Sequence, residues 1–329
     1  MREPAFVSRN KAKWQRFEEM LRGANRANAT PDEKADLFIH LTDDLSYAKT
    51  FYPRSKTTQY LNQLTSSIYS LIYKNKQEDR GRIMRFWTQE LPLLYYEQRR
   101  YLLYAFLIFV SAVVLGVVSS HYDNNFARLI LSDGYVNMTL ENIEKGDPMG
   151  VYKTGNEWYV SVVITIHNIR VSFFCFVMGI FSSLGTAFML LYNGTMVGVF
   201  QYFFYQRGLF WTSFLTIWIH GTLEISAIII AGAAGMVMGN SALFPQTYSR
   251  IDSFIRGAKK GVKMLLGLVP VFIVAGFLEG YVTRHTEMPT WLKIAIIGGS
   301  ACVVLFYFVL YPFALGRQEA QKTVGQQSV

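Results

Sequence analysis

Six long apolar runs fill most of the last two thirds of this sequence. Each run is about as long as the roughly 20 residues that an α-helix needs to cross the hydrocarbon layer of a bilayer. Backbone groups in hydrocarbon have no water to bond, so an apolar run of this length favours a helix. The sequence therefore predicts an all-α polytopic membrane protein, with its transmembrane domain over 100–316. The spans are predicted at about 101–120, 159–182, 185–205, 210–238, 264–283 and 291–313.

Composition and charge agree with a membrane protein. The chain is 51% hydrophobic and only 17% charged, unlike a soluble enzyme. The net charge of +9 does not indicate a surface that binds nucleic acid. In residues 1–100 the Lys and Arg residues are mixed with Asp and Glu, and the Lys and Arg residues after position 100 flank apolar runs. Membrane topology and anionic lipids explain that distribution, so membrane lipids are predicted partners and nucleic acid is not.

The polar segments between the runs predict an orientation. The loop 121–158 carries six acidic and three basic residues, whereas 240–263 carries five basic residues and one acidic residue. Because cytoplasmic loops are enriched in Lys and Arg, 240–263 is predicted inside and 121–158 outside. Six spans then place both termini in the cytoplasm of a bacterium, with 317–329 as a cytoplasmic tail of this inner-membrane protein.

The first hundred residues predict two further parts. Residues 1–80 have apolar positions at helical spacing, such as Leu61, Leu64 and Ile68, which is typical of a helical cytoplasmic domain. Residues 81–99 mix cations with aromatic residues such as Trp87 and lead directly into the first span. We interpret 81–99 as an amphipathic elbow helix on the membrane surface. The alternative is an ordinary core helix of the soluble domain.

A histidine and a carboxylate interrupt the fourth span. His220 and Glu224 are four residues apart, so a helix puts both side chains on one face. A charged side chain at the centre of a bilayer costs roughly 3 kcal/mol on insertion scales, so this face is predicted to contact protein or water. The pair therefore indicates an intramembrane polar site.

Other polar residues in the spans are candidates for the same cluster. Asn193 of the third span and Arg170 of the second are expected to join the pair, and Asn168 lies beside Arg170 in sequence. Arg170 has an alternative, which is to extend its side chain to the membrane surface. Glu279 of the fifth span lies near its outer end, where Arg284 can pair with it.

Small residues predict close helix packing in the third and fourth spans. Gly194 and Gly198 form the small-xxx-small pattern that lets two helices approach closely. The other predicted packing glycines are Gly221, Gly232 and Gly235. Glycines also interrupt the region 183–210, so five spans or a re-entrant segment there is an alternative to six.

The sequence holds no recognisable catalytic motif. His220 and Glu224 have the spacing of two metal ligands on a helix, but no third ligand lies within sequence reach and there is no His-Glu-x-x-His motif. A hydrogen-bonded polar cluster is therefore favoured over a metal site. Without a P-loop, a nucleophile elbow or a dinucleotide-binding glycine pattern, the chain is predicted not to be an enzyme and to need no cofactor.

A series of motifs resembles a known family. Four segments of the chain resemble the stage II sporulation protein M family of bacterial and archaeal membrane proteins. They are 193–198 (NGTMVG), 220–224 (HGTLE), 231–235 (AGAAG) and 277–280 (FLEG). The opening segment 6–14 also looks like the start of members outside spore formers. The family's motif positions carry over as Asn193, Gly194, His220, Gly221, Glu224, Gly235 and Glu279.

The resemblance implies an integral membrane protein that acts as an anchor or scaffold. In spore formers the family member works with peptidoglycan-degrading partners during engulfment. The long N-terminal domain here departs from that short member and points to another process. We therefore expect a non-enzymatic envelope scaffold that forms a homo-oligomer, with a dimer favoured. The alternative is a transporter-like permease for lipid or another envelope substrate, working with a separate ATPase.

Overall fold

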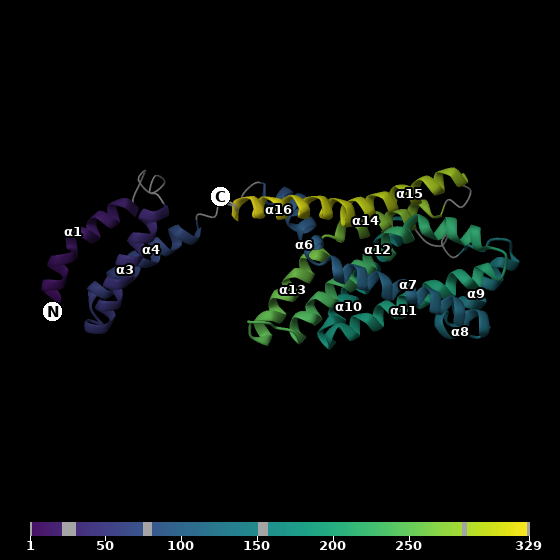
Figure 1. Cartoon of the computed structure of the whole chain (residues 1–329), viewed down its shortest axis with the longest axis horizontal. Coiled ribbons are helices and arrows are strands. Elements are labelled where there is room, and N and C mark those ends of the chain that lie inside the picture. The colour runs from purple at the N-terminus through teal and green to yellow at the C-terminus, as the bar shows by residue number, and fades with distance from the viewer. Residues whose placement is uncertain (1, 22–30, 75–80, 151–156, 285–287, 328–329) are drawn as a thin grey trace. The chain divides into compact units, whose positions relative to one another are not determined.

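The computed structural model describes residues 2–21, 31–74, 81–150, 157–284 and 288–327. These residues are arranged in helices and connecting segments, which confirms the all-α prediction (Figure 1). The chain divides into two compact units, Met1–Arg82 and Ile83–Val329. We call them the N-terminal unit and the membrane unit.

The N-terminal unit is a small helical domain with its own core. Its helices are α1 (Glu3–Leu21), α3 (Pro31–Phe51) and α4 (Lys56–Lys74). Trp14 of α1 is buried, and its indole Nε1 donates a 2.7 Å hydrogen bond to Asp44 of α3. The predicted stripe of α4 faces this core: Leu61, Leu64 and Ile68 are all buried. Burial of these apolar stripes is what holds the three short helices together.

The membrane unit begins with a bent helical segment that packs on the rest of the unit. It consists of α5 (Arg82–Arg85), the π-helical turn η1 (Phe86–Glu90) and α6 (Leu91–Glu97). Tyr95 is fully buried, and its hydroxyl donates to the carbonyl of Met264 at 3.1 Å. Ion pairs join Lys263 to Glu90 at 3.3 Å and Lys260 to Glu97 at 3.2 Å. The segment predicted as a surface elbow is thus helical and fastened to a basic helix.

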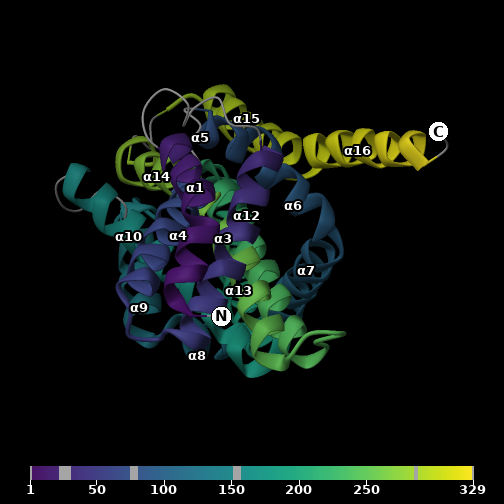
Figure 2. The same ribbon diagram turned by 90° about the vertical axis from the view of Figure 1, so that its left-hand side faces the viewer.

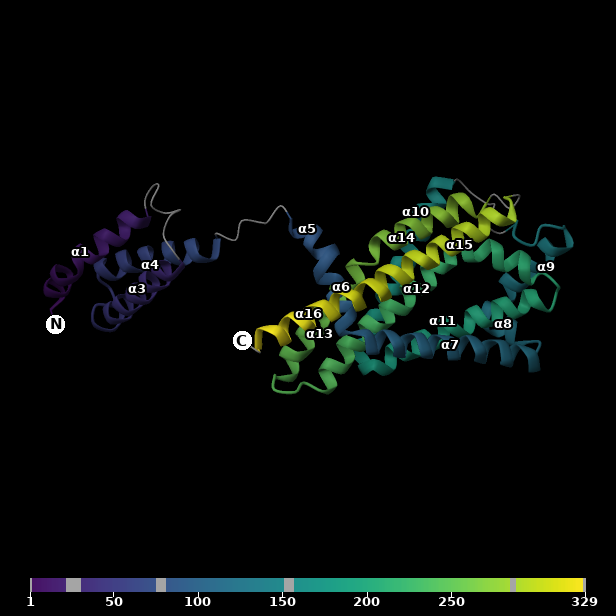
Figure 3. The ribbon, with the colours of Figure 1, turned by 45° about the horizontal axis from the view of Figure 1, so that its top comes forward.

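The first half of the bundle pairs two long helices. α7 (Arg99–Tyr122) and α11 (Ser182–Tyr205) lie side by side along their lengths (Figure 3). Between them in sequence come α8 (Phe126–Leu131), α9 (Asp133–Glu144), α10 (Glu157–Val177) and the 3₁₀ turn η3 (Met178–Phe181). The segment predicted as the outer loop is therefore largely helical where the structure describes it.

The longest helix, α12 (Phe210–Leu243), forms the centre of the membrane unit. It packs against α7, α10, α11, α13, α14 and α15. The helices that follow are α13 (Arg250–Leu266), α14 (Val269–Phe277), the π-helical η4 (Leu278–Val282), α15 (Thr290–Leu305), the π-helical η5 (Phe306–Leu310) and α16 (Tyr311–Gln327). The basic segment 240–263, predicted as a loop, is mostly α13, and α16 extends away from the bundle (Figure 2).

Within the described residues, five helical stretches are long and apolar enough to cross a membrane. They are Arg99–Tyr122, Trp158–Tyr205, Phe210–Leu243, Arg250–Val282 and Thr290–Gln321. The second has 48 residues, more than twice the length that one crossing needs. It is broken at η3, where Ser182 adopts a positive φ of 60°. The predicted spans 159–182 and 185–205 correspond to the two arms on either side of this break.

Candidate functional site

The predicted polar pair lies in the interior of the membrane unit. His220 is 3% exposed and Glu224 follows one turn later on α12. The helix continues into a small-residue region from Ala231 to Gly235 that is entirely buried. His220 is thus enclosed by protein and Glu224 is half-buried.

A second carboxylate reaches the pair from η4. Oε1 of Glu279 lies 3.9 Å from Nε2 of His220, and the Glu279 side chain is 16% exposed. One ligand atom from each of His220, Glu224 and Glu279 can be chosen so that all three lie within 4.8 Å of one another. The sequence offered no third ligand near the α12 pair, and the fold brings one from 55 residues farther along the chain.

Asn168 of α10 completes one side of the cluster. Its side-chain amide donates a hydrogen bond to Oε1 of Glu224. Three segments of the bundle, α10, α12 and η4, therefore meet at one buried polar cluster. We call His220, Glu224, Glu279, Asn168 and Thr283 the polar cluster.

Thr283 is the member that the sequence did not indicate. Nδ1 of His220 lies 3.0 Å from its hydroxyl oxygen, and that hydroxyl also donates to the carbonyl of Leu278 at 3.0 Å. Thr283 is 1% exposed. A signal existed in the spacing, since Thr283 follows Glu279 by four residues and so shares its side of a helix.

Two predicted members lie apart from these contacts. Arg170 is exposed on α10, two residues beyond Asn168 and therefore roughly opposite it on the helix. Asn193 is buried on α11, where its amide donates to the carbonyl of Met189 in the same helix at 2.8 Å. The structure therefore brings together His220, Glu224, Asn168 and Glu279 of the predicted set, without Arg170 or Asn193.

The predicted glycines mark close helix contacts, with one exception. A Cβ on Gly194 would lie 2.6 Å from the carbonyl oxygen of Phe109, and one on Gly198 would collide with the carbonyl of Val113. Gly232 and Gly235 similarly face Leu190 and Thr186 of α11. A Cβ on Gly221 would meet only a side chain of its own helix, Ile217, at 3.6 Å. Gly221 therefore does not mark a helix crossing.

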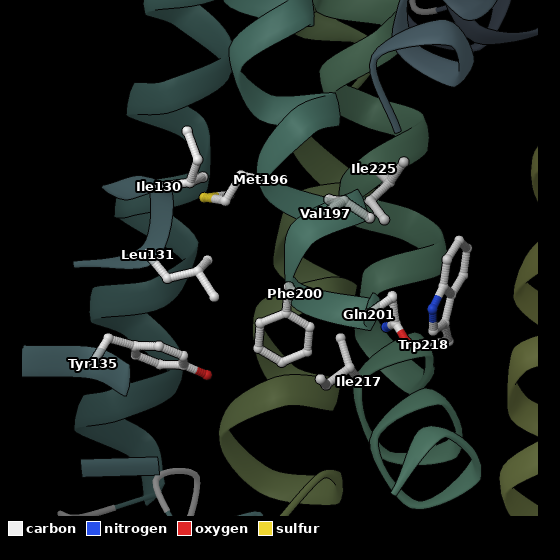
Figure 4. A pocket seen from close by; sticks show the side chains of 10 residues that line it. All are labelled: Ile130, Leu131, Tyr135, Met196, Val197, Phe200, Gln201, Ile217, Trp218 and Ile225. Carbon is white, nitrogen blue, oxygen red and sulfur yellow. The ribbon is translucent and has the colours of Figure 1, made fainter. Parts of the chain in front are cut away.

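A separate apolar pocket of about 320 Å³ is lined by residues of α8, α9, α11 and α12 (Figure 4). Its polar side chains include Tyr135 of α9, Gln201 of α11 and Trp218 of α12. On α12 the pocket is lined by Ile217, Trp218 and Ile225, none of which belongs to the polar cluster. The pocket and the polar cluster are therefore distinct features of one helix. The remaining lining residues are Ile130, Leu131, Met196, Val197 and Phe200.

Comparison with known proteins gives two family matches. Residues 4–74 match a model described as a domain of unknown function, DUF8413. No curated protein and no solved structure matches the chain. Residues 105–284, which include the whole polar cluster and all five predicted packing glycines, match the model described as stage II sporulation protein M. This match covers more than half of the chain, which therefore belongs to the stage II sporulation protein M family.

Proposed function

We propose that this protein is a non-enzymatic assembly scaffold of the bacterial cell envelope that works as a homodimer. The observation that carries the proposal is the surface of α15, the first part of the membrane-length stretch Thr290–Gln321, where small residues are exposed and no described residue packs on the glycines. A Cβ on Gly298 or Gly299 would have no neighbour within 4 Å. Ala295 and Cys302, on the same side of the helix, are also exposed.

The other glycines of the bundle show why this surface is unusual. Gly194 and Gly198 contact the backbone of α7 directly, so a small residue there allows close packing. Lipid chains gain little from a glycine surface, and small residues in membrane helices concentrate where helices meet. The α15 surface of Ala295, Gly298, Gly299 and Cys302 thus has the composition of a helix contact, although no described residue of the chain packs on its glycines.

A second copy of the chain is the occupant that we propose. Two-fold symmetry is the most common arrangement of oligomers, and an axis along the membrane normal brings a residue close to its own copy. Two α15 helices would then face each other at Gly298 and Gly299. We propose the bacterial cytoplasmic membrane as the location, with both termini and α13 inside, because Lys and Arg concentrate at α13.

Cys302 provides a direct test in native membranes. It is a free, exposed cysteine on the proposed contact surface, whereas Cys175 is buried. Two cysteines cross-link when their Cα atoms come within about 7 Å. Mild oxidation should therefore give a disulfide-linked dimer that Cys302→Ser abolishes and Gly299→Leu strongly reduces.

The matched control is Ser111→Leu, which enlarges another small, exposed residue of a membrane-length helix, α7. It should leave the yield of cross-linked dimer unchanged. A wild-type protein that stays monomeric after oxidation, or a Gly299→Leu protein that cross-links as well as wild type, would rule out the α15 contact.

A transporter-like permease is the second candidate, and the polar cluster favours it. Two carboxylates and an imidazole in the interior of a membrane bundle are the kind of groups that line proton and ion paths. Glu224→Gln separates the two candidates in cells. Loss of cross-linked dimer would indicate a structural role for the cluster, whereas an intact dimer with lost cellular function would indicate a transport path and a separate ATPase partner.

A further inference from the structure

The side chains of the polar cluster point to a bound ion, and this inference does not depend on the scaffold proposal. Glu224 and Glu279 are two carboxylates in the interior of a membrane-length bundle. Two adjacent carboxylates in an apolar environment cannot both be ionised without a compensating positive charge. Either a proton or a cation must therefore accompany them.

Both hydrogen bonds of Thr283 form together only when Nδ1 of His220 carries the ring proton. The Thr283 hydroxyl has one proton, which it donates to the carbonyl of Leu278. Its oxygen must therefore accept from Nδ1–H of His220, 3.0 Å away. A neutral imidazole protonated at Nδ1 presents the lone pair of Nε2, and Nε2 is the nitrogen that faces Glu279.

This arrangement is the one that metal-ligating histidines use. Such a histidine donates its second ring N–H to a neighbouring acceptor, which holds the ring in place for the metal. The 3.9 Å between Nε2 of His220 and Oε1 of Glu279 is too long for a hydrogen bond. Both atoms are within reach of one ion, because two metal–ligand bonds of about 2.0–2.2 Å span at most about 4.4 Å between their ligand atoms.

The second carboxylate is held in the same way. The amide of Asn168 donates to Oε1 of Glu224 and holds that carboxylate next to the carboxylate of Glu279. Glu279 projects from a π-helical turn, a backbone form that occurs frequently at functional sites. Asn168 and Thr283 thus hold Glu224 and His220 of α12 in place, and Glu279 of η4 lies beside both.

We propose that His220, Glu224 and Glu279 bind one divalent transition-metal ion, of the zinc, manganese or iron class. One imidazole nitrogen and two carboxylate oxygens are ligands that these ions accept. Two carboxylates carry two negative charges, so a divalent ion makes the buried site neutral, whereas a monovalent ion leaves one charge uncompensated. The ion would join α12 to η4 inside the bundle.

The test uses the full-length protein in detergent, purified by a tag without histidine. We expect about one divalent ion per chain by elemental analysis, because a site with three protein ligands retains its metal. After removal of this metal, Co²⁺ should restore occupancy with the visible absorption of a low-symmetry site. Glu279→Gln and Glu224→Gln should each weaken Co²⁺ binding by at least about tenfold.

Glu141→Gln is the matched control, because Glu141 is exposed on α9. It should bind Co²⁺ as wild type does. Thr283→Val gives a second measurement if a ligand variant fails to fold: affinity should fall, and Thr283→Ser should restore it. Purified protein without stoichiometric metal and without Co²⁺ absorption, or binding that persists in both glutamine variants, would overturn the site. The Cys302 cross-link reports separately on the dimer.

Discussion

Nδ1 of His220 lies 3.0 Å from the hydroxyl oxygen of Thr283, a contact that joins the centre of α12 to the end of η4. Both residues are almost completely buried, at 3% and 1% exposure. The same hydroxyl donates a hydrogen bond to the carbonyl of Leu278, so Thr283 ties the imidazole to η4. The proposed metal site depends on this orientation of the imidazole ring.

Thr283→Val should therefore destabilise the membrane unit. Valine keeps the shape of threonine but leaves Nδ1–H of His220 buried without this acceptor, which costs about 1–3 kcal/mol. Thermal unfolding of the purified protein in detergent should show a lower midpoint. Thr283→Ser retains the hydroxyl and should lose less than half as much. Equal losses for the two variants would show that the methyl group, not the hydroxyl, matters at this position.

The sequence predicts the bundle well because membrane crossing imposes a strong pattern. Runs of about 20 apolar residues are a requirement of the bilayer, so each predicted span overlaps one of the long apolar stretches, with two of the six spans in Trp158–Tyr205. Local spacing also identified His220 and Glu224, since a four-residue separation on a helix is enough to place them together. Both predictions used only relationships along one helix.

The rest of the cluster depends on how separate helices are rotated toward each other. Asn168 and Arg170 are both polar residues of one span, yet a rotation of about 200° puts only Asn168 toward Glu224. Asn193 satisfies its amide within its own helix, and Thr283 looked like an ordinary residue at a helix end. A single sequence does not specify these rotations, so it could not show which polar residues join the cluster and which lie apart from it.

Where α7 and α11 cross, we expect a single added methyl group to lower the stability of the membrane unit strongly. A Cβ on Gly198 would collide with the carbonyl of Val113, and backbone cannot move aside as a side chain can. Gly198→Ala should therefore lower the stability of the membrane unit by about 1–3 kcal/mol. Thermal unfolding in detergent measures the change.

Gly134→Ala is the control for that prediction. Gly134 lies in the first turn of α9, where an added Cβ would meet nothing within 4 Å. The substitution should be neutral or stabilise the protein by up to about 1 kcal/mol, because alanine is the better helix former. If both alanine variants behaved alike, close backbone contact at Gly198 would not be what makes glycine necessary there.

Because Tyr95 of α6 is buried, we expect the protein to lose stability at alkaline pH. Burial raises the pKa of its phenol well above the ordinary value of 10.0, with a smaller contribution from Tyr307. Below pH 10 both the folded and unfolded chains keep the proton, and the full stabilisation is present. Above pH 10 the unfolded chain releases it first, so stability falls as pH rises toward the folded-state pKa.

The measurement is the unfolding midpoint of the protein between pH 8 and pH 11. Tyr95→Phe should lower stability at pH 8 by about 1 kcal/mol, through the lost hydrogen bond to Met264, and should flatten the alkaline decline. Tyr122→Phe should change neither quantity, because Tyr122 is 83% exposed at the end of α7. An alkaline decline of the same slope in Tyr95→Phe would assign it to other groups.

The N-terminal unit offers a test that leaves the bundle untouched. Nε1 of buried Trp14 donates to Oδ2 of Asp44 at 2.7 Å, and Lys13 pairs with the same carboxylate oxygen. Asp44→Ala removes the acceptor and leaves the indole N–H buried, at a cost of about 1–3 kcal/mol. Hydrogen exchange of the full-length protein should show faster exchange throughout α1, α3 and α4.

Asp44→Asn separates the hydrogen bond from the charge. The asparagine oxygen can still accept from Trp14, so most of the protection should remain although the ion pair with Lys13 is lost. The ion pair lies at the surface, with the Lys13 side chain 35% and the Asp44 side chain 14% exposed, and such a pair contributes little, about 0–1 kcal/mol. Exchange as fast in Asp44→Asn as in Asp44→Ala would show that the ion pair, rather than the indole hydrogen bond, holds α1 to α3. Exchange in α12 should be the same in both variants, because the two units have separate cores.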